Sequence, residues 1–130
     1  MNAPLEMNPE IRARWAAALR SGDYEQGREH LRRGDKFCCL GVLCDLAIKD
    51  GEPVSASEIA EADGGAYWGY DGHPYYLPAS VREWAGLTCG NPEVEVKGVD
   101  GLSWATLAAM NDGQHFSFAR IADAIDGGAS

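Results

Sequence analysis

The stretch Phe37-Cys-Cys-Leu-Gly-Val-Leu-Cys-Asp-Leu-Ala47 contains the longest apolar run of this 130-residue chain, and the rest of the fold must be arranged around it. As a helix it is apolar on nearly every side, which is typical of a helix surrounded by other elements. We expect it to run from about Cys38 to about Lys49, where Asp50-Gly51 ends it. The run is far too short to cross a bilayer.

Capping residues predict further helices on both sides of this run. The first is amphipathic and begins with an Asn cap and a Pro at its first position. The last begins at a Ser cap and carries its apolar residues on one face. The expected helices span Asn8 to Ser21, Ser55 or Ser57 to Ala62, Leu77 to Gly86, Ser103 to about Met110, and Ser117 to about Asp126.

Strand patterns are fewer. Glu93 to Lys97 alternates polar and apolar residues, which predicts a strand with one wet face. Two aromatic runs between Tyr67 and Tyr76 flank Asp71-Gly72, which favours a β-hairpin, although Pro74 confines the second arm to an edge. The polar segment Asp23 to Asp35 is interpreted as a loop or short hairpin.

Together these elements predict an α+β fold. We expect a single compact domain over residues 8–126, in which several short helices surround a central buried helix beside a small antiparallel sheet or hairpin. Residues 1–7 and 127–130 have little apolar content, so they are expected to be flexible ends.

The net charge of −9 argues against binding to a nucleic acid polymer or an anionic membrane. Seven of the eleven basic residues nevertheless precede residue 40, so one part of the chain can hold an anion locally. No signal peptide pattern is present, and four cysteines, three of them in one apolar run, fit free thiols of a reducing compartment. We therefore expect a cytoplasmic protein.

Metal-binding and catalytic motifs are missing. The spacing of Cys38, Cys39 and Cys44 does not place them on one helix face, so core packing is the favoured interpretation and no metal is expected. There is no phosphate-binding glycine motif and no hydrolase elbow, and no cofactor is expected. His73 and His115 remain candidates for an acid or base near neutral pH, although surface roles are favoured.

The run Phe37 to Ala47 resembles the signature of a widespread family of small uncharacterised proteins encoded by bacteriophages and prophages. The similarity covers roughly residues 8–126 and includes Trp15 to Gly22, Tyr24, Gln26-Gly27-Arg28, Leu77-Pro78 with Trp84, Asn111-Asp112, and Ser117-Phe118 with Ile121 to Asp123. Small phage proteins of this kind include inhibitors of host defence, among them sponges that sequester cyclic ADP-ribose isomers or cyclic dinucleotides. The resemblance implies such a role and supplies no catalytic residues.

The leading hypothesis is a phage-encoded binding protein that sequesters a small nucleotide immune signal. Forked donors of Arg28 and Arg32 would hold phosphates, and Trp68 or Tyr75 would stack a base. The remaining expected ligand-binding residues are Tyr24, Asn111 and Asp112, the last two for a base edge or sugar. Because one small chain offers little surface to bury a polar ligand, we expect a homo-oligomer.

Two other functions stay open. The protein could cleave such a nucleotide, with His73 or His115 as acid or base, or it could block a host protein through its acidic surface. For Asn111-Asp112, the competing interpretation is a helix end and turn. For the basic stretch Arg28 to Lys36, the competing interpretation is a solvated loop with salt bridges to its own Glu29 and Asp35.

Overall fold

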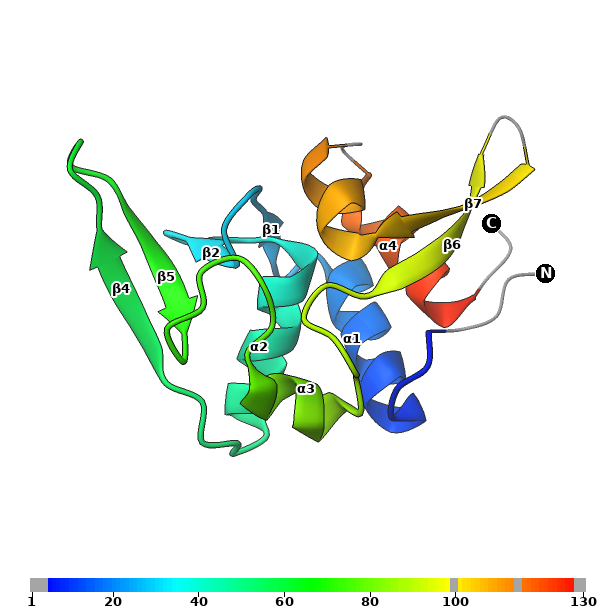
Figure 1. Cartoon of the computed structure of the whole chain (residues 1–130), viewed down its shortest axis with the longest axis horizontal. Helices are drawn as coiled ribbons and strands as arrows, with labels where there is room; N and C mark the ends of the chain where they lie inside the picture. Colours follow the sequence, from blue (N-terminus) through cyan, green and yellow to red (C-terminus); the bar gives the residue numbers. More distant parts are fainter. Residues whose placement is uncertain (1–4, 99–100, 114–115, 128–130) are drawn as a thin grey trace.

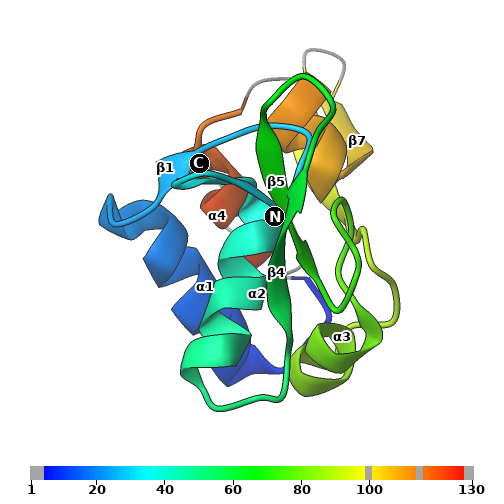
Figure 2. The ribbon, with the colours of Figure 1, turned by 90° about the vertical axis from the view of Figure 1, so that its left-hand side faces the viewer.

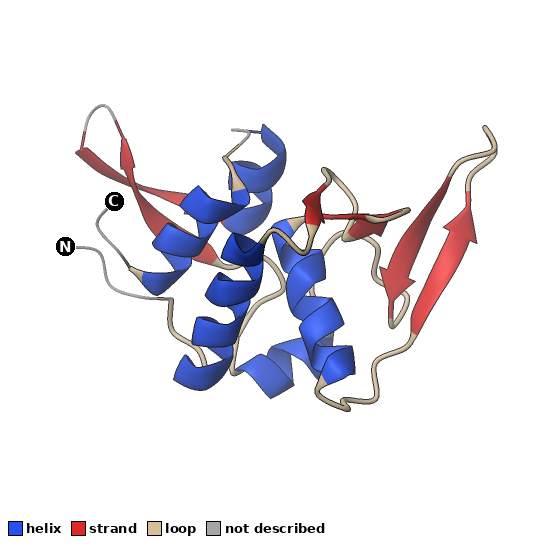
Figure 3. Ribbon diagram, turned by 180° about the vertical axis from the view of Figure 1, so that it is seen from behind, coloured by secondary structure: helices blue, strands red, loops and turns tan. Residues whose placement is uncertain are grey.

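The helices gather in the middle of the molecule, between two sheets at opposite ends (Figures 1 and 3). The computed structural model describes residues 5–98, 101–113 and 116–127. Its elements are α1 (Pro9–Ser21), β1 (Glu25–Gln26), β2 (Arg32–Arg33), β3 (Lys36–Phe37), α2 (Cys39–Lys49), β4 (Ala56–Ala60), β5 (Ala66–Tyr70), α3 (Ala79–Ala85), β6 (Glu93–Gly98), β7 (Gly101–Thr106), the π-helix η1 (Ala109–Gly113) and α4 (Phe118–Asp126). The predicted α+β class and single compact domain are confirmed.

Helix α2 lies at the centre, as its apolar sequence predicts, and eight of its residues are buried. Trp15 of α1 is fully buried and donates from Nε1 to the Cys39 carbonyl at 2.9 Å, which joins the two helices. On another side, Gly41 allows the chain before β2 to lie directly on α2. A Cβ at Gly41 would stand 1.7 Å from the Leu31 carbonyl oxygen, so only glycine fits there.

The larger sheet has five strands in the order β1-β3-β2-β5-β4, and Figure 2 views the molecule from the side where β4 and β5 lie. Only β1 and β3 are parallel; the other neighbours are antiparallel. The strand registers align one residue from each strand in a continuous row: Gln26, Phe37, Arg32, Trp68 and Glu58. Paired residues share a face of the sheet, and Phe37 is buried while Trp68 packs against the core, so this row faces α2.

The second sheet pairs β6 with β7 and lies at the other end of the molecule, beside α4 (Figure 1). Helix α4 packs against α1. In the segment expected to be a flexible end, Leu5 donates its backbone N–H to the Ile125 carbonyl at 2.9 Å, and Leu5 and Met7 pack against the core. Residues 1–4 and 128–130, which make up most of the two expected flexible ends, lie outside the described residues.

Five of the predicted elements are confirmed with small shifts of their ends: α1, α2, α3, β6 and α4. Asn8 caps α1 by accepting from Glu10 N and Ile11 N, and Ser117 caps α4 by accepting from Arg120 N. The polar segment 23–35 is a loop with short strands, as predicted. These elements carry their signals within a few residues, which is why sequence alone locates them.

Two predicted helices are wrong. The segment after Ser55 is strand β4, which pairs along its whole length with the aromatic strand β5, and long-range pairing prevails over the weak helical preference of a short segment. The segment around Ser103 is strand β7, because the backbone groups of β6 require a partner strand. Helical structure starts only at Leu107, directly before the π-helix η1.

The predicted hairpin around Asp71-Gly72 is confirmed only as a tight turn, because no second strand follows it. Strand β5 pairs with β4 through the turn near Gly64, and Asp71-Gly72 forms a tight turn closed by a single Tyr70–His73 bridge. Both turn residues have positive φ, 51° and 83°. Pro74 has no N–H to continue a ladder, and no strand follows it before α3.

Candidate functional site

Arg32 is held between two aromatic rings on the face of the sheet that looks toward α2. Its guanidinium carbon lies 4.4 Å from the centroid of the Trp68 ring and 5.0 Å from that of Phe37. Its Nε donates to the Gly34 carbonyl at 2.8 Å, across the β2–β3 turn. The sheet register creates this arrangement, because Phe37 and Trp68 are the direct cross-strand neighbours of Arg32. The side chain is therefore preorganised.

Tyr70 lies two residues beyond Trp68 on the same face of β5 and is 1% exposed. Its buried hydroxyl makes no hydrogen bond of acceptable geometry with the described residues. Burial raises the pKa of Tyr70 to about 12, and the nearby Arg32 guanidinium opposes that rise. A buried hydroxyl without a partner costs about 1–3 kcal/mol, and the Arg32 side chain is the polar group that lies beside it.

Tyr24 lies at the other side of Phe37, edge-on, with ring centroids 5.1 Å apart. Its hydroxyl donates to Asp45 of α2 in a short hydrogen bond and accepts from Lys49 Nζ at 3.0 Å. Burial, followed by the Asp45 contact, raises the pKa of Tyr24. Tyr24 thus adjoins the Arg32 site through Phe37 and is fixed to α2.

Asn111, an expected ligand contact, is fully buried in the middle of the π-helix turn. Its Oδ1 accepts from Gln26 Nε2 at 2.9 Å and from Cys39 N at 3.3 Å. Its Nδ2 donates to the Gly27 carbonyl at 2.9 Å and to Asp112 Oδ1 at 2.7 Å. Both donors and both acceptor positions of the amide are occupied, which favours a structural role.

Asp112 connects the same turn to the loop that carries Arg28. Its Oδ1 accepts from the backbone N–H of Glu29 at 2.9 Å, and Glu29 adopts a positive φ of 72°. A positive φ is strained for a glutamate, so the Asp112 contact helps to hold the loop in this form. Arg28 itself is exposed on this loop. Asn111 and Asp112 therefore position the basic loop.

Tyr75 lies apart from Arg32 and Trp68. Its ring centroid is 5.1 Å from that of His30, whose ring in turn stacks on Tyr67 at 4.4 Å. Tyr67 and Trp68 are successive residues of β5 and point to opposite faces of the sheet. Trp68 and Tyr75 therefore belong to different faces, and only Trp68 shares a site with Arg32.

The N-terminus of α2, which directly follows the basic part of the chain, has its backbone N–H groups occupied. Asn111 Oδ1 occupies the Cys39 N–H, and the Leu31 carbonyl accepts from Cys38 N at 3.1 Å. All of these residues are buried. The local anion site that the basic stretch predicts is better placed at Arg32, on the sheet.

The cysteines of the central run serve as core, as predicted. Cys38, Cys39 and Cys44 are free and buried, and Cys89 is exposed. Burial raises the pKa of Cys38 to about 12 and raises those of Cys39 and Cys44 well above their usual value. Neutral buried thiols are poor nucleophiles.

The histidine candidates gain little support as an acid or base. His73 is exposed at the end of the Asp71-Gly72 turn. His115 lies outside the described residues. Among the described parts of the chain, no three His, Cys, Asp or Glu side chains cluster as a metal site would need.

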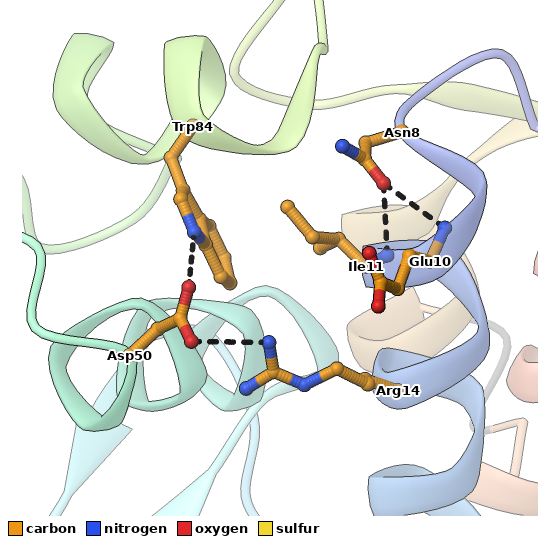
Figure 4. Close-up of polar contacts among 6 residues, drawn as sticks. All are labelled: Asn8, Glu10, Ile11, Arg14, Asp50 and Trp84. Atoms are coloured by element: carbon orange, nitrogen blue, oxygen red, sulfur yellow. Dashed lines mark hydrogen bonds and ion pairs between the residues drawn. The ribbon is translucent and has the colours of Figure 1, made fainter.

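A separate polar cluster at the C-terminal end of α2 is structural (Figure 4). Asp50 accepts from Trp84 Nε1 at 2.9 Å and pairs with Arg14 at 3.2 Å, which ties α2 to α3 and α1. The Trp84 hydrogen bond and the Arg14 charge lower the pKa of Asp50. Nearby, Asn8 caps α1 (Figure 4).

Sequence reasoning missed the residues that lie beside Arg32 and Tyr24: Phe37 and Tyr70 beside Arg32, and Asp45 and Lys49 beside Tyr24. The (i, i+4) spacing of Asp45 and Lys49, which places them on one side of α2, was an available signal. Tyr70 was counted among the aromatic residues, but strand alternation alone cannot show that its hydroxyl is buried and unpaired.

The fold and this site define a single-domain α+β protein with a cationic and aromatic site between a mixed sheet and its central helix. Residues 7–128 match the family described as domain of unknown function (DUF8296), and the chain belongs to that family. No curated protein and no solved structure matches the chain. Among the described residues, no helix has both the length and the apolar character needed to cross a membrane.

Proposed function

We propose that this protein binds and sequesters a small nucleotide-like signal at the site around Arg32. The observation that carries the proposal is the Arg32 guanidinium, which is fixed between the rings of Trp68 and Phe37. Guanidinium groups match phosphate oxygens in geometry and charge. Preorganisation lowers the ordering cost of binding, because the aromatic contacts and the Gly34 hydrogen bond already hold the side chain.

The arrangement changes the expected role of Trp68. The Arg32 guanidinium lies over its ring, so Trp68 acts first as a positioning residue for the cation. Arg28, on the loop held by Asn111 and Asp112, adds a second guanidinium in the same part of the chain. The phosphate contacts are thus the better supported half of the hypothesis.

Sequestration is favoured over cleavage. The carboxylate of Asp45, which lies beyond Phe37 beside Tyr24, is already engaged by Tyr24 and Lys49. The resemblance to phage and prophage proteins supports a role against host nucleotide signalling in the bacterial cytoplasm. Homo-oligomerisation, with ligand at or near the interface, is part of the proposal, because the site is half-exposed in one chain.

Two adjacent arginines provide the test. Arg33 follows Arg32 but points to the other face of β2 and pairs with Glu61 at 2.7 Å. Arg32→Met and Arg33→Met remove the same charge one residue apart. Equilibrium dialysis with cyclic di-AMP, cyclic di-GMP and cyclic ADP-ribose should show binding to wild type, at least about tenfold weaker binding to Arg32→Met, and little change for Arg33→Met.

Two results would count against the proposal. Equal losses in the two variants would mean that the effect is general charge and not the Arg32 site. Failure of the wild-type protein to bind any of the three nucleotides would favour the alternative of a protein partner. Altered nucleotide recovered from the dialysis chamber would instead indicate the cleavage activity.

A further inference from the structure

Strand β4 forms an exposed edge of the larger sheet. It is the last strand in the sheet order and the outermost strand at the left of Figure 1. Its residues are exposed, apart from the half-buried Ile59. Its pairing with β5 is regular over the whole strand, from Ala56 opposite Tyr70 to Ala60 opposite Ala66. A regular edge of this kind presents a row of backbone groups to which another strand can bind.

The hydrogen bonds with β5 show which backbone groups of β4 point to the open edge. At one end of the strand, Asp71 N donates to the Ser55 carbonyl at 2.7 Å. At the other end, Glu61 N donates to the Gly65 carbonyl at 2.7 Å. Successive residues of an antiparallel strand direct their N–H and C=O groups to opposite sides. The even-numbered residues of β4 therefore direct both groups away from β5.

This edge lacks the features that usually prevent strand pairing. Lysine, proline and β-bulges are common on protected edges, and the described strand β4 contains none of them. The opposite edge of the sheet is β1, which has only the two residues Glu25–Gln26 and is protected by its shortness. Of the two edges of this sheet, β4 is thus the one suited to a partner strand.

The sequence of β4 fits an antiparallel second copy of itself best in one register. A two-fold axis at Glu58 would place two glutamates directly opposite each other, which is destabilising. An axis at Ser57 would leave Ile59 outside the overlap of the two strands. An axis at Ile59 places Glu58 opposite the partner subunit's Ala60, so no like charges meet. It also pairs two β-branched side chains across the axis, which suits a strand.

Ile59 also extends an apolar strip on the outer face of the sheet. Its direct neighbour on β5 is Tyr67, whose ring stacks on that of His30 with centroids 4.4 Å apart. A Cβ at Gly69 would lie 3.2 Å from Ile59 Cδ1, so the Ile59 side chain lies along the sheet surface. An axis at Ile59 would join the strips of two subunits and shield this side chain from water.

We infer that two copies of this protein pair through β4, antiparallel about a two-fold axis at Ile59, and form one continuous sheet. This inference gives an interface to the homo-oligomer of the proposed function, but its evidence does not depend on nucleotide binding. Strand β5 lies between β4 and the strand that carries Arg32, so the interface is near the Arg32 site. One strand from each subunit makes a small interface, and a weak dimer is expected.

Cysteine cross-linking tests the register and captures a weak dimer. Ile59→Cys is made in a Cys89→Ser background, because Cys89 is exposed and the other three cysteines are buried. Residues at the axis form a non-hydrogen-bonded pair with Cα atoms about 4.5 Å apart, which is within the range of a disulfide. Oxidised glutathione should therefore join two subunits through position 59 without any nucleotide present.

Ser57→Cys in the same background is the matched control. Position 57 is exposed on the same face, two residues away, but an axis at Ile59 separates its two copies by about 13 Å along the strands, beyond the range of a disulfide. Cross-linked dimer should form at least about tenfold faster in Ile59→Cys than in Ser57→Cys. Equal rates, or no cross-linking of either variant, would overturn the inference.

Proline substitutions test the edge hydrogen bonds. Ala60→Pro, added to Ile59→Cys, removes an N–H that points to the open edge, so it should abolish cross-linking and keep the fold. Ala56→Pro removes an equivalent N–H outside the overlap of the two strands and should leave cross-linking unchanged. Unchanged cross-linking in a folded Ala60→Pro protein would contradict the pairing. Melting temperatures identify a variant that fails to fold, in which case the comparison of positions 59 and 57 decides.

The inference and the proposed function fail in different ways. Nucleotide binding without cross-linking at position 59 would overturn the β4 interface and leave sequestration intact. Cross-linking at position 59 in a protein that binds no nucleotide would leave the interface intact and overturn sequestration.

Discussion

Replacement of Gly41 by alanine tests how closely the sheet approaches α2. The added Cβ would lie 1.7 Å from the Leu31 carbonyl oxygen and 2.6 Å from its carbon. An ordinary carbon–oxygen contact is about 3.3 Å or longer, so the two backbones must separate by about 1.5 Å. The Leu31 carbonyl accepts from Cys38 N, and Leu31 N donates to the Pro74 carbonyl at 2.7 Å. Both hydrogen bonds would weaken.

The expected cost follows from three contributions. Overpacking costs about 1–3 kcal/mol. The weakened hydrogen bonds add about 0.5–1.5 kcal/mol each. Alanine in a helix recovers about 1 kcal/mol relative to glycine. The free energy of unfolding should therefore fall by about 3 kcal/mol, and the Arg32 site should loosen because β2 moves with Leu31.

Urea unfolding followed by tryptophan fluorescence measures this cost. Gly113→Ala is the matched control, because it lies in the π-helix turn and its added Cβ would meet no atom within 4 Å. The control should keep or gain stability. A Gly41→Ala protein within about 0.5 kcal/mol of wild type, or more stable, would refute the close approach of Leu31 to α2.

Three further predictions concern stability and thiol chemistry. Asn111→Leu deletes the four hydrogen bonds of a buried side chain and should lower the free energy of unfolding by about 3 kcal/mol in urea; a loss below about 1 kcal/mol would contradict the structural role. The folded protein lowers the pKa of Asp50 from its usual value of 3.8. The stability that Asp50 contributes is therefore fully present above pH 3.8 and is lost as the pH falls through the lower pKa of the folded state. Asp50→Asn should thus destabilise at pH 7 and have little effect near pH 2 in thermal unfolding, whereas an equal effect at both would oppose the Trp84 and Arg14 contacts. A thiol reagent should label Cys89 rapidly in the native protein and the other three cysteines only after unfolding, and rapid labelling of all four would show that the central run is not buried.

Sequence alone predicted the elements whose signals are local. Helix α1 has its Asn8 cap and Pro9, and α4 has its Ser117 cap. The sequence of α2 is apolar on nearly every side of the helix, which indicates that the helix is buried. Strand β6 alternates cleanly. These features depend on residues within one or two turns, so no partner needs to be known.

Elements defined by their partners were not predicted. Strand β4 has little strand character of its own, and its residues are extended because β5 pairs with them. Strand β7 is likewise extended because it pairs with β6. In both cases the deciding hydrogen bonds join segments that a single-sequence pattern treats separately.

The candidate site was predicted in part. The sequence singled out Arg32 and Trp68, and the structure places them in contact. It also singled out Asn111, whose hydrogen bonds to Gln26 and Gly27, some 84 residues away in the case of Gly27, are visible only in three dimensions. A buried amide and a ligand-binding amide look the same in sequence, since burial is a property of the assembled fold.

The central claim is that the Arg32 site holds a small nucleotide intact. The most direct measurement is to incubate the wild-type protein with a panel of nucleotide signals, remove free ligand, denature by heat and identify what is released by mass spectrometry. We predict an intact cyclic nucleotide from wild type and from Arg33→Met, and none from Arg32→Met. Release of no nucleotide by wild type, or equal release by Arg32→Met, would contradict the claim.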